Sequence, residues 1–155
     1  MTALATWVEA TPFRAHLRFL MAVGALSTAE AAALVGISSA AAEHLLDGRS
    51  GRAVRRISPE MARRLISVSA ADVRGLRWRL VPTERARRQR ARLRQAGHTD
   101  AQIAALAGVR IPEVSELGRS SHCSELLTVR LTAAARAHDA QLGVRRRSAA
   151  LPAAA

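Results

Sequence analysis

Apolar residues recur along this chain in short stretches that have the spacing of amphipathic helices. The first stretch places Phe13, Leu17, Leu20 and Met21 on one side of a helix that begins at Thr11. Tyr is absent, and Ala, Leu, Arg and Glu dominate, so helices are favoured over long strands. We therefore expect an all-α fold. The remaining predicted helices cover residues 28–34, 38–46, 58–68, 83–96, 100–107, 111–118 and 132–141.

Two segments depart from the helical pattern. Between residues 73 and 82, Leu76, Trp78 and Leu80 alternate with Arg, which predicts an extended linker or short strand with Trp78 packed between two units. The end of the chain lacks an apolar period and is expected to be disordered. The predicted organisation is an N-terminal arm (1–10), a first helical unit (11–72), the linker (73–82), a second helical unit (83–142) and a disordered tail (143–155).

The two predicted units contain an internal repeat with an offset of 72 residues. Each copy begins with Ser or Thr, whose side-chain oxygen can accept from the first turn of a helix. Each then has an Ala four residues before a Gly, which can adopt the left-handed backbone of a tight turn, and an apolar seam follows. The aligned pairs are Ala32 with Ala104, Leu34 with Leu106, Gly36 with Gly108, Ile37 with Val109, and Leu45 with Leu117.

This repeated pattern resembles the helix-turn-helix of phage-repressor-type DNA-binding proteins. The residues that follow the first copy, Leu46 to Arg49 and then Pro59-Glu60-Met61-Ala62, resemble actinobacterial and actinophage helix-turn-helix proteins. The resemblance covers roughly residues 12–142 as two copies. It implies two small helical units, each with a helix-turn-helix, in a bacterial or phage transcription regulator that binds double-stranded DNA sequence-specifically. The second helix of each motif would enter the major groove.

The charge of the chain is concentrated in its middle. The 24 basic residues are all Arg and face 12 acids, which gives a net charge of +12. Residues 49–94 hold 15 Arg and three acids, so this third carries +12, against −2 before it and +2 after it. Such a surface favours a polyanionic partner, whose phosphates Arg neutralises. The predicted contacts to the DNA backbone are Arg49, Arg52, Arg55, Arg56, Arg85, Arg87, Arg88, Arg92 and Arg119.

The predicted base contacts lie early in the second helix of each motif. Among these candidates only Arg110 can pair with guanine, whereas a Glu can accept from cytosine N4. Residues 28–47 contain three acids and no Arg, so the first copy either relies on flanking Arg or serves a protein partner. We expect the second copy to be the stronger DNA contact. The candidates are Ser38, Ser39, Glu43 and His44 in the first copy, and Arg110, Glu113 and Ser115 in the second.

Two other functions fit the same residues. A helical protein-interaction adaptor could keep degenerate helix-turn-helix motifs for packing, and an Arg-rich helix could bind RNA. Because the two motifs are joined and unequal, a DNA-binding chain is expected to recognise a non-palindromic site. A monomer is compatible with this arrangement, and the oligomeric state stays open.

Enzymatic, cofactor and membrane functions lack sequence signals. The chain has no Lys for a phosphate-binding loop or Schiff base, no Tyr nucleophile and no Gly-rich loop, so we expect no enzyme and no cofactor. The His residues show no i, i+4 pairing and predict no metal site. The single Cys123 excludes an intramolecular disulfide, and no apolar run reaches the ~18 residues of a membrane span. The expected location is therefore the cytoplasm, in association with the nucleoid.

Overall fold

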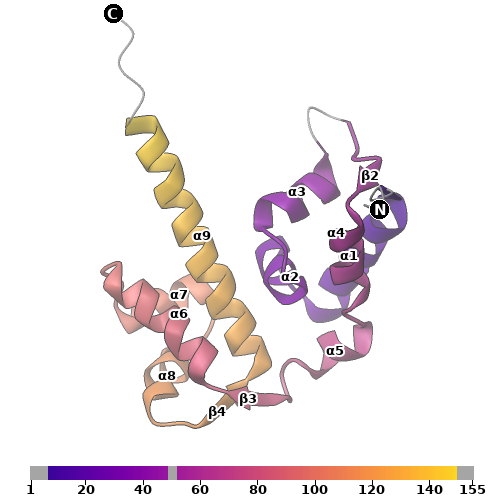
Figure 1. Ribbon diagram of the computed structural model, residues 1–155. Helices are drawn as coiled ribbons and strands as arrows, with labels where there is room; N and C mark the ends of the chain where they lie inside the picture. Colours follow the sequence, from indigo (N-terminus) through magenta and orange to yellow (C-terminus); the bar gives the residue numbers. More distant parts are fainter. Residues whose placement is uncertain (1–6, 49–51, 150–155) are drawn as a thin grey trace, which may run out of the picture. The chain divides into compact units, whose positions relative to one another are not determined.

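The computed structural model describes residues 7–48 and 52–149 and is mostly helical, with two short two-stranded sheets (Figure 1). Arg49, a predicted backbone contact, lies outside the described residues. Contacts within the chain divide it into two compact units, residues 1–79 and residues 80–155. The prediction of a largely helical chain is confirmed.

The first unit contains five helices and one antiparallel strand pair in its described part. Val8 lies opposite Ile57 in that pair. Its core contains the fully buried Leu17, Leu20 and Leu45. The elements are β1 (Val8–Glu9), α1 (Thr11–Gly24), α2 (Thr28–Val35), α3 (Ser39–Asp47), β2 (Arg56–Ile57), α4 (Pro59–Ile66) and α5 (Ala70–Gly75).

The second unit has a similar order of elements. Val81 lies opposite Cys123 in its antiparallel strand pair. Buried side chains from α6, α7, α8 and α9 form its core, with Leu93, Ile103 and Leu131 fully enclosed. The elements are β3 (Leu80–Pro82), α6 (Glu84–Gln95), α7 (Asp100–Ala107), α8 (Ile111–Ser115), the 3-10 helix η1 (Glu116–Gly118), β4 (His122–Ser124) and α9 (Glu125–Ala149).

The repeat extends beyond the segments aligned by sequence. In each unit a strand precedes the first helix, and it pairs with a strand that follows the third helix. The helix after that second strand starts in the same way in both units, since Ser58 Oγ accepts from Met61 N and Ser124 Oγ accepts from Leu127 N, both at 3.2 Å. Each unit therefore shares the order strand, three helices, strand and helix, to which the first unit adds α5 and the second adds η1.

The segment expected as an extended linker or short strand, residues 73–82, is divided between the two units, and only its end forms a short strand. Residues 73–75 complete α5, and Val73 and Leu76 are buried in the first unit, whereas residues 80–82 form β3 of the second. The Trp78 side chain is 82% exposed, so its expected burial is wrong. Alternation of apolar residues with Arg reflected the end of one unit and the start of the next.

The ends of the predicted elements also needed correction. Helix α9 runs from residue 125 to residue 149, so residues 143–149 are helical and not part of a disordered tail. Residues 150–155 of that predicted tail lie outside the described residues. The two residues Val8 and Glu9 of the predicted N-terminal arm form a strand. In the described part no single helix is long and apolar enough to span a membrane, and α1 with α2 passes that test only as a pair bent by 109°.

Candidate nucleic-acid interface

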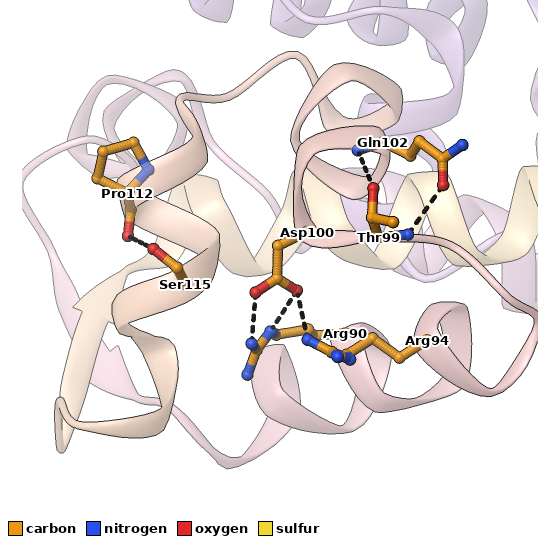
Figure 2. A network of polar contacts seen from close by, with 7 residues as sticks. All are labelled: Arg90, Arg94, Thr99, Asp100, Gln102, Pro112 and Ser115. Atoms are coloured by element: carbon orange, nitrogen blue, oxygen red, sulfur yellow. Dashed lines mark hydrogen bonds and ion pairs between the residues drawn. The ribbon is translucent and has the colours of Figure 1, made fainter.

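Helices α2 and α7 begin with the same local chemistry. Ser27 Oγ accepts from Glu30 N at 3.2 Å, while Ser27 N donates to the Glu30 carboxylate at 2.7 Å. Thr99 and Gln102 exchange the equivalent bonds at 3.3 and 2.8 Å (Figure 2). These reciprocal bonds satisfy amides that the first turn of a helix leaves free.

The turns between α2 and α3 and between α7 and α8 both reverse at a glycine in the left-handed region, with φ of 83° at Gly36 and 61° at Gly108. The next amide bonds back to the alanine of the repeat, from Ile37 N to Ala32 O and from Val109 N to Ala104 O, each at 3.0 Å. Both alanines are 1% exposed. The predicted roles of the cap, the small residue and the turn glycine are confirmed in both copies.

An arginine on the first helix of each unit bonds to the last turn of α3 in the first unit and to η1, directly after α8, in the second. Arg14 Nε donates to Leu45 O at 2.8 Å, and Arg87 Nε donates to Leu117 O at 2.7 Å. Arg87 also donates to the carbonyls of Gly118 and Ser120 at 3.2 and 2.8 Å. A cation at the C-terminal end of a helix is favourable because free carbonyls concentrate there. The guanidinium of Arg87, a predicted phosphate contact, is thus used within its unit.

A second arginine of each unit holds the turn itself. Arg64, on α4, donates to the carbonyl of Gly36, and Arg130, on α9, donates to the carbonyl of Gly108 at 3.1 Å. Sequence reasoning missed both residues. A separate alignment of the last helices would have found them, because Ser58 and Ser124 precede Arg64 and Arg130 by the same six residues.

The arginine run of α6 has two different faces. Arg90 donates two bonds to the Asp100 carboxylate at 3.0 and 2.6 Å, and Arg94 adds a bond at 3.2 Å (Figure 2). These bonds lower the pKa of Asp100, mainly through Arg90, and raise the pKa of Arg90. The face formed by residues 87, 90 and 94 therefore serves the internal structure of the unit.

The other face of α6 carries three predicted backbone contacts. Arg92 forms an ion pair with Asp139 of α9 at 2.7 Å, and its side chain remains 58% exposed. Arg85 and Arg88 are exposed, and no described residue forms a hydrogen bond or ion pair with either guanidinium. Arg119, immediately after η1, is exposed in the same way. Among the predicted backbone contacts in the described part of the second unit, the guanidinium groups without a partner are therefore those of Arg85, Arg88 and Arg119.

In the first unit, the predicted backbone contacts after α3 lie in one exposed segment. Arg52, Arg55 and Arg56 are exposed, and together with Arg14 and Glu9 they line an open hollow of about 1070 Å³. The backbone of this segment is held against α1 by a hydrogen bond, because Arg14 donates to Val54 O at 2.6 Å. The hollow is rich in arginine and wide open.

The base-contact candidates on α3 form an acidic, small-residue surface. Ser38 Oγ is used as a helix cap, accepting from Ala41 N at 3.1 Å, and Ser39 is partly buried. Glu43 and His44 are exposed and line a shallow hollow of about 570 Å³. The other residues around it are Ala40, Ala41, Asp47 and Gly48, so the hollow contains no cationic Arg.

The base-contact candidates on α8 interact with one another. The Glu113 carboxylate accepts from Arg110 N at 3.0 Å and from Arg110 Nε at 3.2 Å. Ser115 Oγ donates to Pro112 O at 3.3 Å, within the same helix (Figure 2). Glu113 is therefore occupied at the start of α8, whereas the Arg110 side chain is 84% exposed. Sequence reasoning missed the neighbouring Ile111, whose side chain is also exposed.

No described group of three or more His, Cys, Asp or Glu residues has the arrangement of a metal site. Two such side chains, His98 and His138, are in edge-to-face contact, with ring nitrogens 3.2 Å apart. Comparison of the chain with family models, curated proteins and solved structures found no match.

Proposed function

We propose that this chain is a sequence-specific protein that binds double-stranded DNA and regulates transcription. In this proposal α2 with α3 and α7 with α8 are two helix-turn-helix motifs, and the second unit makes the main contact. The observation that carries the proposal is the set of exposed arginines on α6 and at the two ends of α8 with η1. Arg110 precedes α8 with its side chain 84% exposed, Arg119 follows η1, and Arg85 and Arg88 add free guanidinium groups from α6.

Charge favours the second motif over the first as the DNA contact. The exposed face of α3 carries Glu43 and Asp47 and no arginine, so its approach to phosphate is repulsive. Around α8 the exposed Arg119 and Glu116 balance each other and Glu113 pairs with the exposed Arg110, so this face is neutral where that of α3 is acidic. Phosphate contacts supply most of the affinity and base contacts supply the selectivity.

A protein-interaction role is the second candidate, and the hollow on α3 favours it. Glu43, His44 and Asp47 surround small alanines there, which allows close approach of a basic partner segment. This role is compatible with DNA binding by the second unit. As the only role of the chain, it leaves the exposed arginines around α8 without a partner.

A salt titration of DNA binding tests the proposed function. The full chain is titrated into a fluorescent random-sequence duplex at several salt concentrations, with duplex RNA and single-stranded DNA as competitors. Exchange of Arg85 and Arg88 for Ala should flatten the slope of log affinity against log salt by about 1.8, since each lost phosphate contact is worth about 0.9.

The matched control exchanges Arg74 and Arg77 for Ala. Both are exposed arginines of the first unit, so the control removes the same charge and should leave the slope unchanged. Equal slopes for the two double variants contradict the assignment of α6. No binding to duplex DNA contradicts the proposed function, and tighter binding to duplex RNA replaces it with RNA binding.

A further inference from the structure

Two apolar side chains are exposed at the corner between α7 and α8, beside Arg110. Ile111 is the first residue of α8 and is 52% exposed, and Leu106, in the last turn of α7, is 53% exposed. The equivalent positions in the first unit hold Ser39 and Leu34, and both are partly buried. The second motif therefore presents an apolar surface that the first motif does not.

The position of Ile111 at the start of α8 indicates which chemical group of DNA its side chain would contact. Side chains at the start of the second motif helix are those that reach base edges when such a helix enters the major groove. The apolar group that a base pair presents there is the C5-methyl of thymine. An exposed isoleucine at this place fits a methyl group and offers nothing to a phosphate.

The contact between Arg110 and Glu113 indicates what the rest of the Arg110 side chain can bind. Glu113 accepts from both the backbone N and the Nε of Arg110, which restrains the guanidinium and takes up one of its donors. The terminal nitrogens Nη1 and Nη2 form no contact with a described residue, so they remain as a two-donor fork. Such a fork matches O6 and N7 of guanine.

We propose that α8 reads a guanine next to a thymine, with Arg110 on the guanine O6 and N7 and Ile111 on the thymine methyl. Glu113 is a positioning residue that holds the guanidinium in place, and it does not contact cytosine. This inference rests on the proposed function, because it names the bases that the same helix recognises.

Replacing single atoms of the DNA tests this inference without changing its base pairing. The probes are a short duplex of alternating guanine and thymine against adenine and cytosine, the same duplex with uracil for thymine, and the same duplex with 7-deazaguanine for guanine. Loss of each contacted methyl should weaken binding about fourfold. Loss of guanine N7 should weaken it about fivefold or more.

Two variants assign the losses caused by uracil and by 7-deazaguanine to residues, and a third variant is their control. Ile111→Ala should bind the thymine and uracil duplexes equally, and Glu113→Gln should lose much of its discrimination against 7-deazaguanine. Ile66→Ala is the matched control, since Ile66 is 64% exposed on α4 of the first unit, and this variant should discriminate like the unchanged protein. Equal thermal unfolding of Ile111→Ala and Ile66→Ala excludes a folding defect as the cause.

The outcomes separate this inference from the function on which it rests. Equal binding of the unchanged protein to all three duplexes overturns the base assignment and leaves DNA binding intact. Uracil discrimination that survives in Ile111→Ala also overturns the role of Ile111. Absence of binding to every duplex overturns the proposed function and the inference together.

Discussion

Helices α1 and α6 hold equivalent places in the two units but use different chemistry. Helix α1 packs through Leu17 and Leu20, both buried, and Arg14 reaches the end of α3. Helix α6 buries Ala86 and Leu93 and forms ion pairs through Arg90 and Arg94 in addition to the Arg87 contact. The equivalent contacts of Arg14 and Arg87 set an offset of 73 residues between these two helices, so position 90 corresponds to position 17, and an ion pair stands where the first unit has a leucine.

This difference shows that arginine content and available positive charge are separate quantities. The contact of Arg14 with Leu45 recurs as that of Arg87 with Leu117, so this arginine belongs to the fold. The arginines outside the shared contacts are the ones that supply available positive charge to the surface of each unit. The structure thus reduces an arginine-rich helix to the few side chains that a polyanion can reach.

The strongest test of equivalence between the units is removal of matching core leucines. Leu20→Ala and Leu93→Ala should each lower the free energy of unfolding by about 3 kcal/mol, since both side chains are almost completely buried. Urea unfolding of each variant measures the loss. A loss of unfolding free energy several times larger in one unit would show that the two cores do not contribute equally to stability.

Arg87→Ala should lower the free energy of unfolding by about 2 kcal/mol, because three carbonyls lose a charged donor. The matched control is Arg88→Ala, which removes the exposed neighbour and should change stability by less than about 0.5 kcal/mol. Thermal and urea unfolding measure both variants. If the two variants are equally stable, Arg87 has no structural role and returns to the set of free cations.

Asp100→Asn should destabilise the second unit by about 1.5 kcal/mol at neutral pH, because Arg90 and Arg94 lose their shared acceptor. The pKa of Asp100 is lowered in the folded protein, so its contribution is fully present above the unfolded pKa near 3.8. The contribution is lost as the pH falls through the lower folded pKa.

Unfolding measured at neutral pH and below pH 4 therefore gives a difference between Asp100→Asn and the unchanged protein that shrinks in acid. Glu84→Gln, at an exposed position on α6, serves as the control. A difference that stays constant with pH contradicts the ion-pair assignment.

The smallest effects are expected at the turn glycines. Gly36→Ala and Gly108→Ala should each cost about 1 kcal/mol, since both positions have positive φ while their surroundings leave room for a methyl group. Differential scanning calorimetry can compare the two variants directly. A stabilising effect at either position would show that its left-handed turn is not required.

Local chemistry predicted the helix pairs well. Ser27 and Thr99 act as caps, and Gly36 and Gly108 reverse the chain, because these features depend on residues only a few positions apart. The second helix of the second copy was expected over residues 111–118, and α8 with η1 covers this range. Short-range capping and turn geometry override much of the ambiguity of an alanine-rich sequence.

Features that depend on distant residues could not be read from the sequence. Strands β1 and β2 have two residues each, too few to show an alternating pattern, and form because their partners meet in the folded unit. The end of α9 lacks an apolar period, but its Ala, Arg, Gln and Leu residues have high helix propensity and extend an already formed helix.

The sequence predicted the residue types of the candidate site better than the role of each residue. Arg110 is as exposed as its predicted position requires, whereas Glu113 and Ser38 are engaged in helix capping. The arginines of residues 85–94 that have partners bond to residues between six and 47 positions away, from Arg94 with Asp100 to Arg92 with Asp139. A linear charge count cannot show which of these guanidinium groups are neutralised internally.

The anchoring of both ends of each motif gives the molecule an exchangeable part. Residues 27–45 and residues 99–117 are 19 residues each, begin at a capping hydroxyl and end at a carbonyl held by Arg14 or Arg87. Their central turns are held by Arg64 or Arg130 from outside the segment. A chimera that carries the 99–117 cassette in both places would keep Arg14, Arg64, Arg87 and Arg130 on the surrounding frame and Asp100 opposite Arg90 and Arg94, so the proposed recognition surface becomes a transplant of 19 residues.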